Sequence, residues 1–269
     1  MTDISLDRFV LATRSLFDYE FNKPPFPYPA KTQPKAPPIG NARRVGTAFD
    51  YAMRLCLAKL NHIPVNEIRL VAEKAATRRK NREFVRDFRE KLQCFLEGKL
   101  EISDLLADCI VLAKLEPLAR GAPEYLYWSP DIFRVEDSDV EDLQNLVGLI
   151  DNELFVATSR CILNPSFGRS GPPVGDADFI LDDAIIDIKT YKCLEFKRQD
   201  FRQLLGYFVL NLREGNVYGE LKRLGIYYPR FGIPFTFLVP APKNGWEVFR
   251  NEFEDAIVLL KECLKGIEE

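Results

Sequence analysis

Histidine is nearly missing from this chain, with one among 269 residues, and that scarcity narrows the chemistry open to it. His62 lies in LNHIP, at the predicted end of a helix, and no GxSxG motif accompanies it as a nucleophile. The six cysteines are scattered without a CxxC pair, so the sequence predicts no zinc or iron–sulfur site. Neither GxxxxGK[ST] nor GxGxxG occurs, which argues against a P-loop and against a Rossmann dinucleotide site.

Long apolar runs are also missing, and no stretch approaches the roughly 20 residues that a membrane helix needs. The opening MTDISLDRFVLATRSLF carries acidic residues early and has no signal-peptide cleavage pattern. We therefore expect a cytoplasmic protein without membrane contact. The formal net charge of -3 lends no overall support to nucleic-acid binding, which leaves that role to a local basic patch.

The elements that the sequence does contain predict an α/β domain. Residues 45–60 predict an amphipathic helix with Thr47 as its N-cap and Asp50 at the edge of its apolar stripe. Residues 66–98 predict a second, long helix, and strands alternate with helices further along the chain. Residues 23–38 hold seven prolines with two aromatics between them, which predicts an extended arm packed on the domain. This order of elements favours a central mixed sheet flanked by helices.

The stretch VGDADFILDDAIIDIKT, residues 174–190, predicts a hairpin whose two-residue loop is Asp182-Asp183. In this register Asp178 faces Asp187 across the strands, and Lys189 lies on the same face as Asp187. The apolar pairs expected in the same register are Phe179–Ile186, Ile180–Ile185 and Leu181–Ala184.

Two carboxylates facing each other among apolar residues repel more strongly as the effective dielectric constant falls. A shared proton, the ammonium of Lys189 or a divalent cation would each compensate. Mg²⁺ prefers oxygen ligands, and Asp178, Asp187 and the backbone carbonyl of Ile188 offer three. Asp176 faces Lys189 in this register, and a slip of two residues would give it the place of Asp178. A surface hairpin with a salt bridge would also explain the pattern.

The charged residues of this hairpin resemble the signature of the PD-(D/E)XK nucleases. The resemblance is carried by Asp178, Asp187, Ile188 and Lys189. QLLGY, from Gln203 to Tyr207, is similar to the QxxxY helix motif of the RecB-like branch. VGTAFDY at 45–51 resembles the helix that opens such domains, with Asp50 where that branch often has His or Glu.

This resemblance implies a single nuclease domain over residues 1–269 with a restriction-endonuclease-like core. The arm at 23–38 and a helical insertion at about 64–150, between the first core helix and the catalytic sheet, would be additions to that core. It further implies Mg²⁺ or Mn²⁺ as the cofactor, without an iron–sulfur cluster. The implied metal ligands are Asp178, Asp187, the Ile188 carbonyl and, as a further candidate, Asp50. Lys189 would position water and stabilise charge, Gln203 would orient the site or touch substrate, and Tyr207 would support it.

Residues 74–92 hold eight Lys and Arg against three acids, and either a solvated helix face or a phosphate-contacting face explains them. The candidate nucleic-acid contacts are Arg43, Arg44, Arg78, Arg79, Lys80 and Arg82. We therefore expect a metal-dependent deoxyribonuclease, endo- or exonuclease, in a defence, phage or repair setting, with DNA as substrate and a helicase or other protein as partner. The alternative is a catalytically silent nuclease-fold module that binds nucleic acid or a protein.

Overall fold

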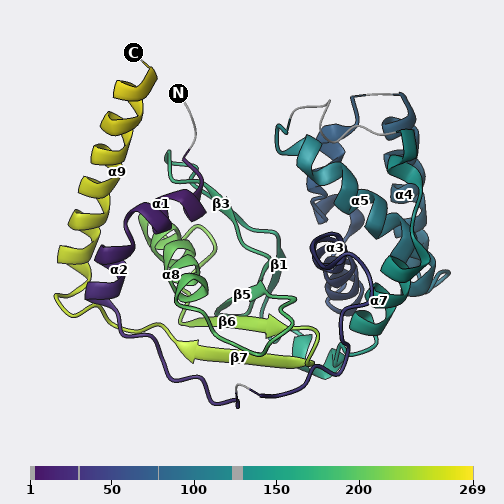
Figure 1. Cartoon of the computed structure of the whole chain (residues 1–269), viewed down its shortest axis with the longest axis horizontal. Helices are drawn as coiled ribbons and strands as arrows, with labels where there is room; N and C mark the ends of the chain where they lie inside the picture. Colours follow the sequence, from purple (N-terminus) through teal and green to yellow (C-terminus); the bar gives the residue numbers. More distant parts are fainter. Residues whose placement is uncertain (1–3, 30, 78, 123–129, 269) are drawn as a thin grey trace.

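The computed structural model describes residues 4–29, 31–77, 79–122 and 130–268, which form eight α-helices and seven strands (Figure 1). The helices are α1 (Leu6–Ala12), α2 (Arg14–Glu20), α3 (Ala42–Leu60), α4 (Arg79–Leu96), α5 (Leu106–Ala119), α7 (Asp137–Val147), α8 (Arg198–Arg213) and α9 (Trp246–Glu268). The strands are β1 (Cys161–Leu163), β2 (Ser166–Phe167), β3 (Gly175–Asp176), β4 (Phe179–Leu181), β5 (Ala184–Ile188), β6 (Arg223–Tyr228) and β7 (Ile233–Leu238). Among the described helices, none is both long enough and apolar enough to cross a bilayer.

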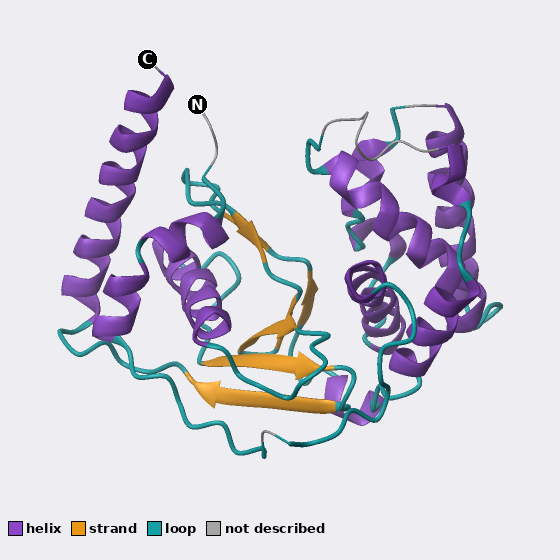
Figure 2. Cartoon of the chain, in the orientation of Figure 1, coloured by secondary structure: helices purple, strands orange, loops and turns teal. Residues whose placement is uncertain are grey.

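Five strands form one mixed sheet in the order β1-β4-β5-β6-β7, in which only β5 and β6 run parallel. Helices cover both of its faces (Figure 2). On β5, Ile186 faces the core that includes α3, α5 and α7, whereas Ile185 faces the core that includes α1 and α8. The α/β class with a mixed sheet, expected from the order of elements, is confirmed.

The hairpin of β4 and β5 has the predicted loop and apolar register. Phe179 pairs with Ile186, Ile180 with Ile185 and Leu181 with Ala184. The ladder ends there, however, so the predicted backbone pairing of Asp178 with Asp187 is wrong. Asp178 lies in a bend, where its carbonyl accepts from the amide of Asn164 at 2.8 Å.

Asp176 does not face Lys189, because it belongs to a separate two-stranded sheet. It pairs with Ser166 of β2 and not with β5. The chain between Asp176 and Phe179 therefore crosses from one sheet to the other, and the hairpin register cannot be extended through it.

The helix predicted for 45–60 is α3, but it begins at Ala42 with Asn41 as its N-cap and not with Thr47. The Asn41 side chain accepts from the amide of Arg44 at 3.0 Å, which satisfies a donor that the first turn leaves open. Asp139 of α7 holds the preceding backbone by accepting from the Asn41 amide at 2.7 Å. Capping thus extends the helix three residues upstream.

The long helix predicted for 66–98 is confirmed only in its second half, since α4 begins at Arg79 and ends at Leu96. Two short 3₁₀ turns, Val65–Glu67 and Val71–Ala75, precede it. The guanidinium of Arg89 donates to the carbonyls of Val65 and Ile68 at 2.8 and 2.9 Å. A tertiary donor therefore takes carbonyls that a continuous helix would bond internally.

The proline-rich segment lies against β6 and β7. The ring of Phe26 packs on Phe235 at 5.1 Å and on Tyr228 at 5.7 Å between centroids. Further along, the amide of Ala36 donates to the carbonyl of Arg230 at 3.1 Å. The segment contributes aromatic packing without adding a strand.

Candidate active site

The charged residues of the hairpin gather where β5 ends. Asp187 is buried at 4% exposure on β5, and Lys189 follows the strand directly. Asp178 joins them by a different route from the one predicted. Its Oδ2 accepts from the backbone amide of Ile188 at 2.6 Å, so the carboxylate takes the place of a strand partner.

The carboxyl of Asp178 lies against that of Asp50, which α3 brings to the same place. Burial raises the pKa of Asp178 well above its usual value, and the negative charges of Asp50 and Asp187 raise it further. Burial likewise raises the pKa of Asp50, although the adjacent Arg54 opposes the shift. These two acids therefore hold protons more tightly than ordinary aspartates do.

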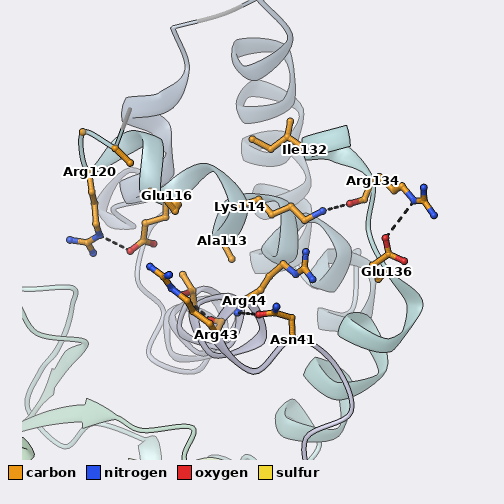
Figure 3. A pocket seen from close by; sticks show the side chains of 14 residues that line it. Asn41, Arg43, Arg44, Ala113, Lys114, Glu116, Arg120, Ile132, Arg134 and Glu136 are labelled. Carbon is orange, nitrogen blue, oxygen red and sulfur yellow. Dashed lines mark hydrogen bonds and ion pairs between the residues drawn. The ribbon is translucent and has the colours of Figure 1, made fainter. Parts of the chain in front are cut away.

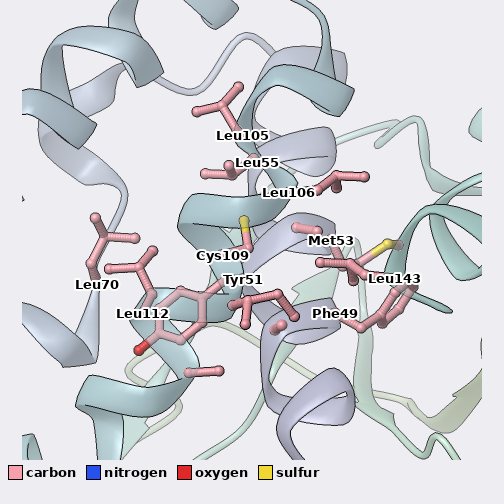
Figure 4. Packing of buried hydrophobic residues seen from close by; sticks show 14 of the residues in the cluster. Phe49, Tyr51, Met53, Leu55, Leu70, Leu105, Leu106, Cys109, Leu112 and Leu143 are labelled. Carbon is pink, nitrogen blue, oxygen red and sulfur yellow. The ribbon is translucent and has the colours of Figure 1, made fainter. Parts of the chain in front are cut away.

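A glycine permits α3 to come this close to the end of β5. A Cβ on Gly46 would lie 2.6 Å from the Oγ1 of Thr190, closer than real Cβ contacts. Gly46 is one turn before Asp50 on the same helix, so the close approach sets the depth at which Asp50 enters. Around this helix the apolar residues pack on α5 and α7 (Figure 4).

Lys189 sits between a carboxylate and an amide. Its Nζ is 2.7 Å from Asp187 Oδ2 and donates to Gln203 Oε1 at 3.0 Å. Burial by itself lowers the pKa of Lys189, but the charge of Asp187 and the hydrogen bond to it outweigh burial and raise the pKa. The side chain therefore remains an ammonium ion at neutral pH.

Helix α8 presents Gln203 and Tyr207 on one face, as their i,i+4 spacing predicts. The Gln203 amide donates to the Tyr207 hydroxyl at 3.2 Å and to Asp7 Oδ1 of α1 at 3.0 Å. Tyr207 in turn donates to the backbone carbonyl of Asp176 at 2.8 Å. The two motif residues thus link α8 to Lys189 and to β3.

The carboxylate of Asp176 is already committed to other partners. Its Oδ1 accepts from the hydroxyl of Ser166 at 2.6 Å and from Arg69 at 3.2 Å. Arg120 lies 3.8 Å from its other oxygen. Two arginines therefore compensate the charge of Asp176, whereas Asp178 accepts from a backbone amide and lies beside Asp50.

A pocket of about 300 Å³ opens beside these acids and is lined by Asp50, Asp178, Ile188 and Glu116. Asp187 is not among the residues that line it. The oxygens Asp50 Oδ1 and Glu116 Oε2 are buried without a hydrogen-bond partner among the described residues. Carboxylate oxygens of this kind are the ligands that hard divalent cations such as Mg²⁺ prefer.

Within the described part of the chain, no group of three or more His, Cys, Asp or Glu side chains is arranged to hold a metal ion. The adjacent carboxyls of Asp50 and Asp178 fit Mg²⁺ or Mn²⁺ by donor type, although Arg54 already pairs with Asp50. The metal-ligand assignments for Asp178, Asp187, Ile188 and Asp50 stay predictions.

The candidate nucleic-acid contacts divide between two places. Arg43 lines the carboxylate pocket, and both Arg43 and Arg44 line a larger cleft next to it. Lys80 and Arg82 line neither, and Arg82 donates to the carbonyl of Thr77 at 2.6 Å. Arg78 and the side chain of Arg79 lie outside the described residues.

Four charged residues of the site escaped sequence reasoning, namely Asp7, Arg54, Glu116 and Arg120. The spacing of Arg54, four residues after Asp50 on a predicted helix, could have predicted the ion pair that the two residues form. Glu116 is a carboxylate in the otherwise apolar run of α5. Asp7 had no signal in the sequence, since only the tertiary fold brings α1 to Gln203.

No family model, no curated protein and no solved structure matches this chain. The case for its function therefore depends on its own residues and their geometry.

Proposed function

We propose that this protein is a metal-dependent nuclease that hydrolyses phosphodiester bonds of DNA through a PD-(D/E)XK-like site. One observation carries the proposal. Motif residues from two separate segments, 178–189 and 203–207, meet in one hydrogen-bonded network at the end of β5. A chance pattern in the sequence would not require the side chains of Lys189 and Gln203, one from each segment, to touch.

The network suggests a division of labour. A bound Mg²⁺ or Mn²⁺ would supply Lewis acidity and lower the pKa of a coordinated water. Asp178 and Asp50, with Ile188 beside them, would hold it. Lys189 acts by its fixed positive charge on the attacked phosphate, because its raised pKa prevents it from serving as a base. Gln203 fixes the direction of that ammonium.

A second candidate is the silent nuclease-fold module, and one observation favours it. The Arg54 guanidinium already pairs with Asp50, and no three-residue metal group is present in the described ranges. If Arg54 is a permanent occupant, the site binds DNA backbone without cutting it. A cleavage assay separates the two candidates.

The assay combines purified protein with linear, circular, single-stranded and double-stranded DNA in Mg²⁺, in Mn²⁺ and in chelator. We expect cleavage only with metal, and a loss of about 10²-fold or more in Lys189→Ala, comparable to removal of one preorganised electrostatic group. Asp187→Ala should lose activity as well. The products will distinguish endonuclease from exonuclease, and added helicase will show whether duplex substrates need unwinding.

Lys192→Ala is the matched control, because Lys192 is exposed in the same loop and outside the network. It should cut at the wild-type rate. Cleavage that persists in both Lys189→Ala and Asp187→Ala would show that the active site lies elsewhere. Absence of cleavage with either metal, combined with retained DNA binding, would favour the silent module.

A further inference from the structure

A cleft of about 900 Å³ adjoins the carboxylate pocket, between the start of α3, the end of α5 and the segment that follows residue 130 (Figure 3). Among the described residues, its charged lining is mainly basic. These cations are Arg43, Arg44, Lys114, Arg120 and Arg134, and the acids are Glu116 and Glu136.

Three of these cations already have carboxylate partners. The pairs are Arg44–Asp139 at 2.6 Å, Arg120–Glu116 at 2.7 Å and Arg134–Glu136 at 3.5 Å. Across the described residues, Arg43 and Lys114 have no ion-pair partner. Among the described residues, the cleft therefore holds two cations without an ion-pair partner, one from α3 and one from α5.

Lys114 is held there at a cost in electrostatic energy. Its Nζ donates to the backbone carbonyl of Arg134, a neutral acceptor. Burial lowers the pKa of Lys114 and the positive charge of Arg44 lowers it further, whereas the negative charges of Asp139 and Glu136 oppose the shift. An anion bound in the cleft would relieve that repulsion.

Helix α3 adds to the attraction for anions. It is 19 residues long and starts at the cleft, where Asn41, Arg43 and Arg44 line the wall. The positive end of its dipole therefore lies at the cleft, where the carboxylate of Asp139 already offsets part of it by accepting from the Asn41 amide.

The cleft and the carboxylate pocket are continuous, because Arg43, Thr47, Glu116 and Arg120 line both. We propose that the cleft holds the phosphate backbone of a single nucleic-acid strand on one side of the bond to be cut, with Arg43 and Lys114 as the main contacts. The position of the strand relative to the bond to be cut rests on the proposed nuclease function. The volume lies in the range of small-ligand pockets, which suits a few nucleotides of one strand and not a duplex.

The test measures binding in chelator, so that it needs no catalysis. A fluorescently labelled single-stranded oligonucleotide is titrated with wild type, Arg43→Gln and Lys114→Met while salt is varied. Each variant should bind about tenfold more weakly at low salt. The slope of log K against log salt should fall by about 0.7, because each substitution removes one cation that neutralises a phosphate. Lys222→Gln is the control, because Lys222 is exposed, pairs with Glu220 and lines neither the cleft nor the pocket.

Two further arms identify the phosphate. The first arm compares oligonucleotides with and without a terminal phosphate. If the terminal phosphate raises the affinity of the wild type but not of the variants, the strand end lies in the cleft. If the two oligonucleotides bind equally, internal phosphates lie there. Unchanged binding by both variants would overturn the inference and leave the nuclease proposal intact. Stronger binding of duplex than of single strand, with the same weakening in the variants, would overturn the assignment to a single strand.

Discussion

Two buried arginine–aspartate pairs in this protein differ in how completely they are satisfied. Arg230 and Asp142 are both fully buried and joined by two bonds, at 2.8 and 3.1 Å. The carbonyl of Ala36 accepts a further Arg230 donor, and Asp142 accepts from the amides of Ile39 and Gly40. Every charge in this pair has a partner, and the pair ties the arm, α7 and the β6–β7 turn together.

The pair of Arg54 and Asp50 is left incomplete. Arg54 Nε has no partner within the described residues, and the carboxyl of Asp50 meets the carboxyl of Asp178, a second acid, where the closed pair has backbone amides. A buried unsatisfied group costs free energy, so its retention calls for an explanation outside folding. The first pair is fully bonded within the fold, and the second leaves buried polar atoms without a hydrogen bond.

The strongest way to break the closed pair is Asp142→Ala. It leaves the Arg230 guanidinium buried without a counter-charge, which should cost about 3–5 kcal/mol of unfolding free energy. Urea unfolding measures the loss. Asp87→Ala, which disrupts an exposed pair, should change stability by no more than about 0.5 kcal/mol. A similar small loss in both variants would contradict a structural role for the closed pair.

Added Mg²⁺ should stabilise the folded protein through the acids at the incomplete pair and not through the closed pair. At a concentration 100 times its dissociation constant, Mg²⁺ should stabilise the wild type by about 2.7 kcal/mol, because it binds the folded state. Asp178→Asn and Asp50→Asn should lose most of this gain. Thermal unfolding at matched ionic strength measures it, and an equal gain in all three proteins would argue against these ligands.

Neutralising Asp178, which lies beside the incomplete pair, should change stability with the opposite sign from neutralising Asp142 of the closed pair. The pKa of Asp178 is raised in the folded state, so the wild type loses stability as pH rises from the unfolded pKa of about 3.9 towards the folded value. Asp50, Asp187 and Lys189 are the charges that act on it. In chelator, Asp178→Asn should therefore be more stable than wild type by about 0.5–2 kcal/mol at neutral pH.

The same gain should vanish below a pH of about 4, where Asp178 is protonated in both states. Asp142→Asn, the matched change at the closed pair, should destabilise at neutral pH. Denaturant midpoints across pH test both signs. A loss of stability in Asp178→Asn would mean that its carboxylate supports the fold.

The smallest effect should come from Asp7, which accepts from Gln203 at the rim of the site. Asp7→Ala should change stability by no more than about 0.5 kcal/mol, since the side chain is exposed. Loss of one orienting hydrogen bond worth about 0.5–1.5 kcal/mol should slow cleavage by a few-fold. Asp7→Asn keeps the acceptor and should retain the rate. Equal rates in the alanine variant and wild type would contradict the positioning role.

The sequence pattern predicted the features that depend on neighbouring residues along the chain. The β4–β5 loop and its apolar register followed from alternation, and Gln203 with Tyr207 followed from helical spacing. The misplacement of Asp176 has a physical cause, since its strand belongs to another sheet and the pleat does not continue through the bend at Asp178.

Tertiary contacts decided what the sequence pattern missed. Arg89 breaks the helix predicted for 66–98 by taking its carbonyls, and nothing near 65–68 in the sequence announces that. Glu116 joins the pocket because α5 packs on α3, and periodicity alone does not pair two helices.

The hydrogen bond from Gln203 to Asp7 joins residues 196 positions apart, and the ion pair of Arg202 with Asp18 spans 184. At translation rates of about 5–20 residues per second, about 10–40 s pass between the synthesis of Asp7 and that of Gln203. Throughout that interval the nascent chain carries an α1 without its partner and an unfinished network around Lys189. Assembly of the site is therefore a late event in biogenesis, and a ribosome-bound chain that stops short of α8 cannot form it.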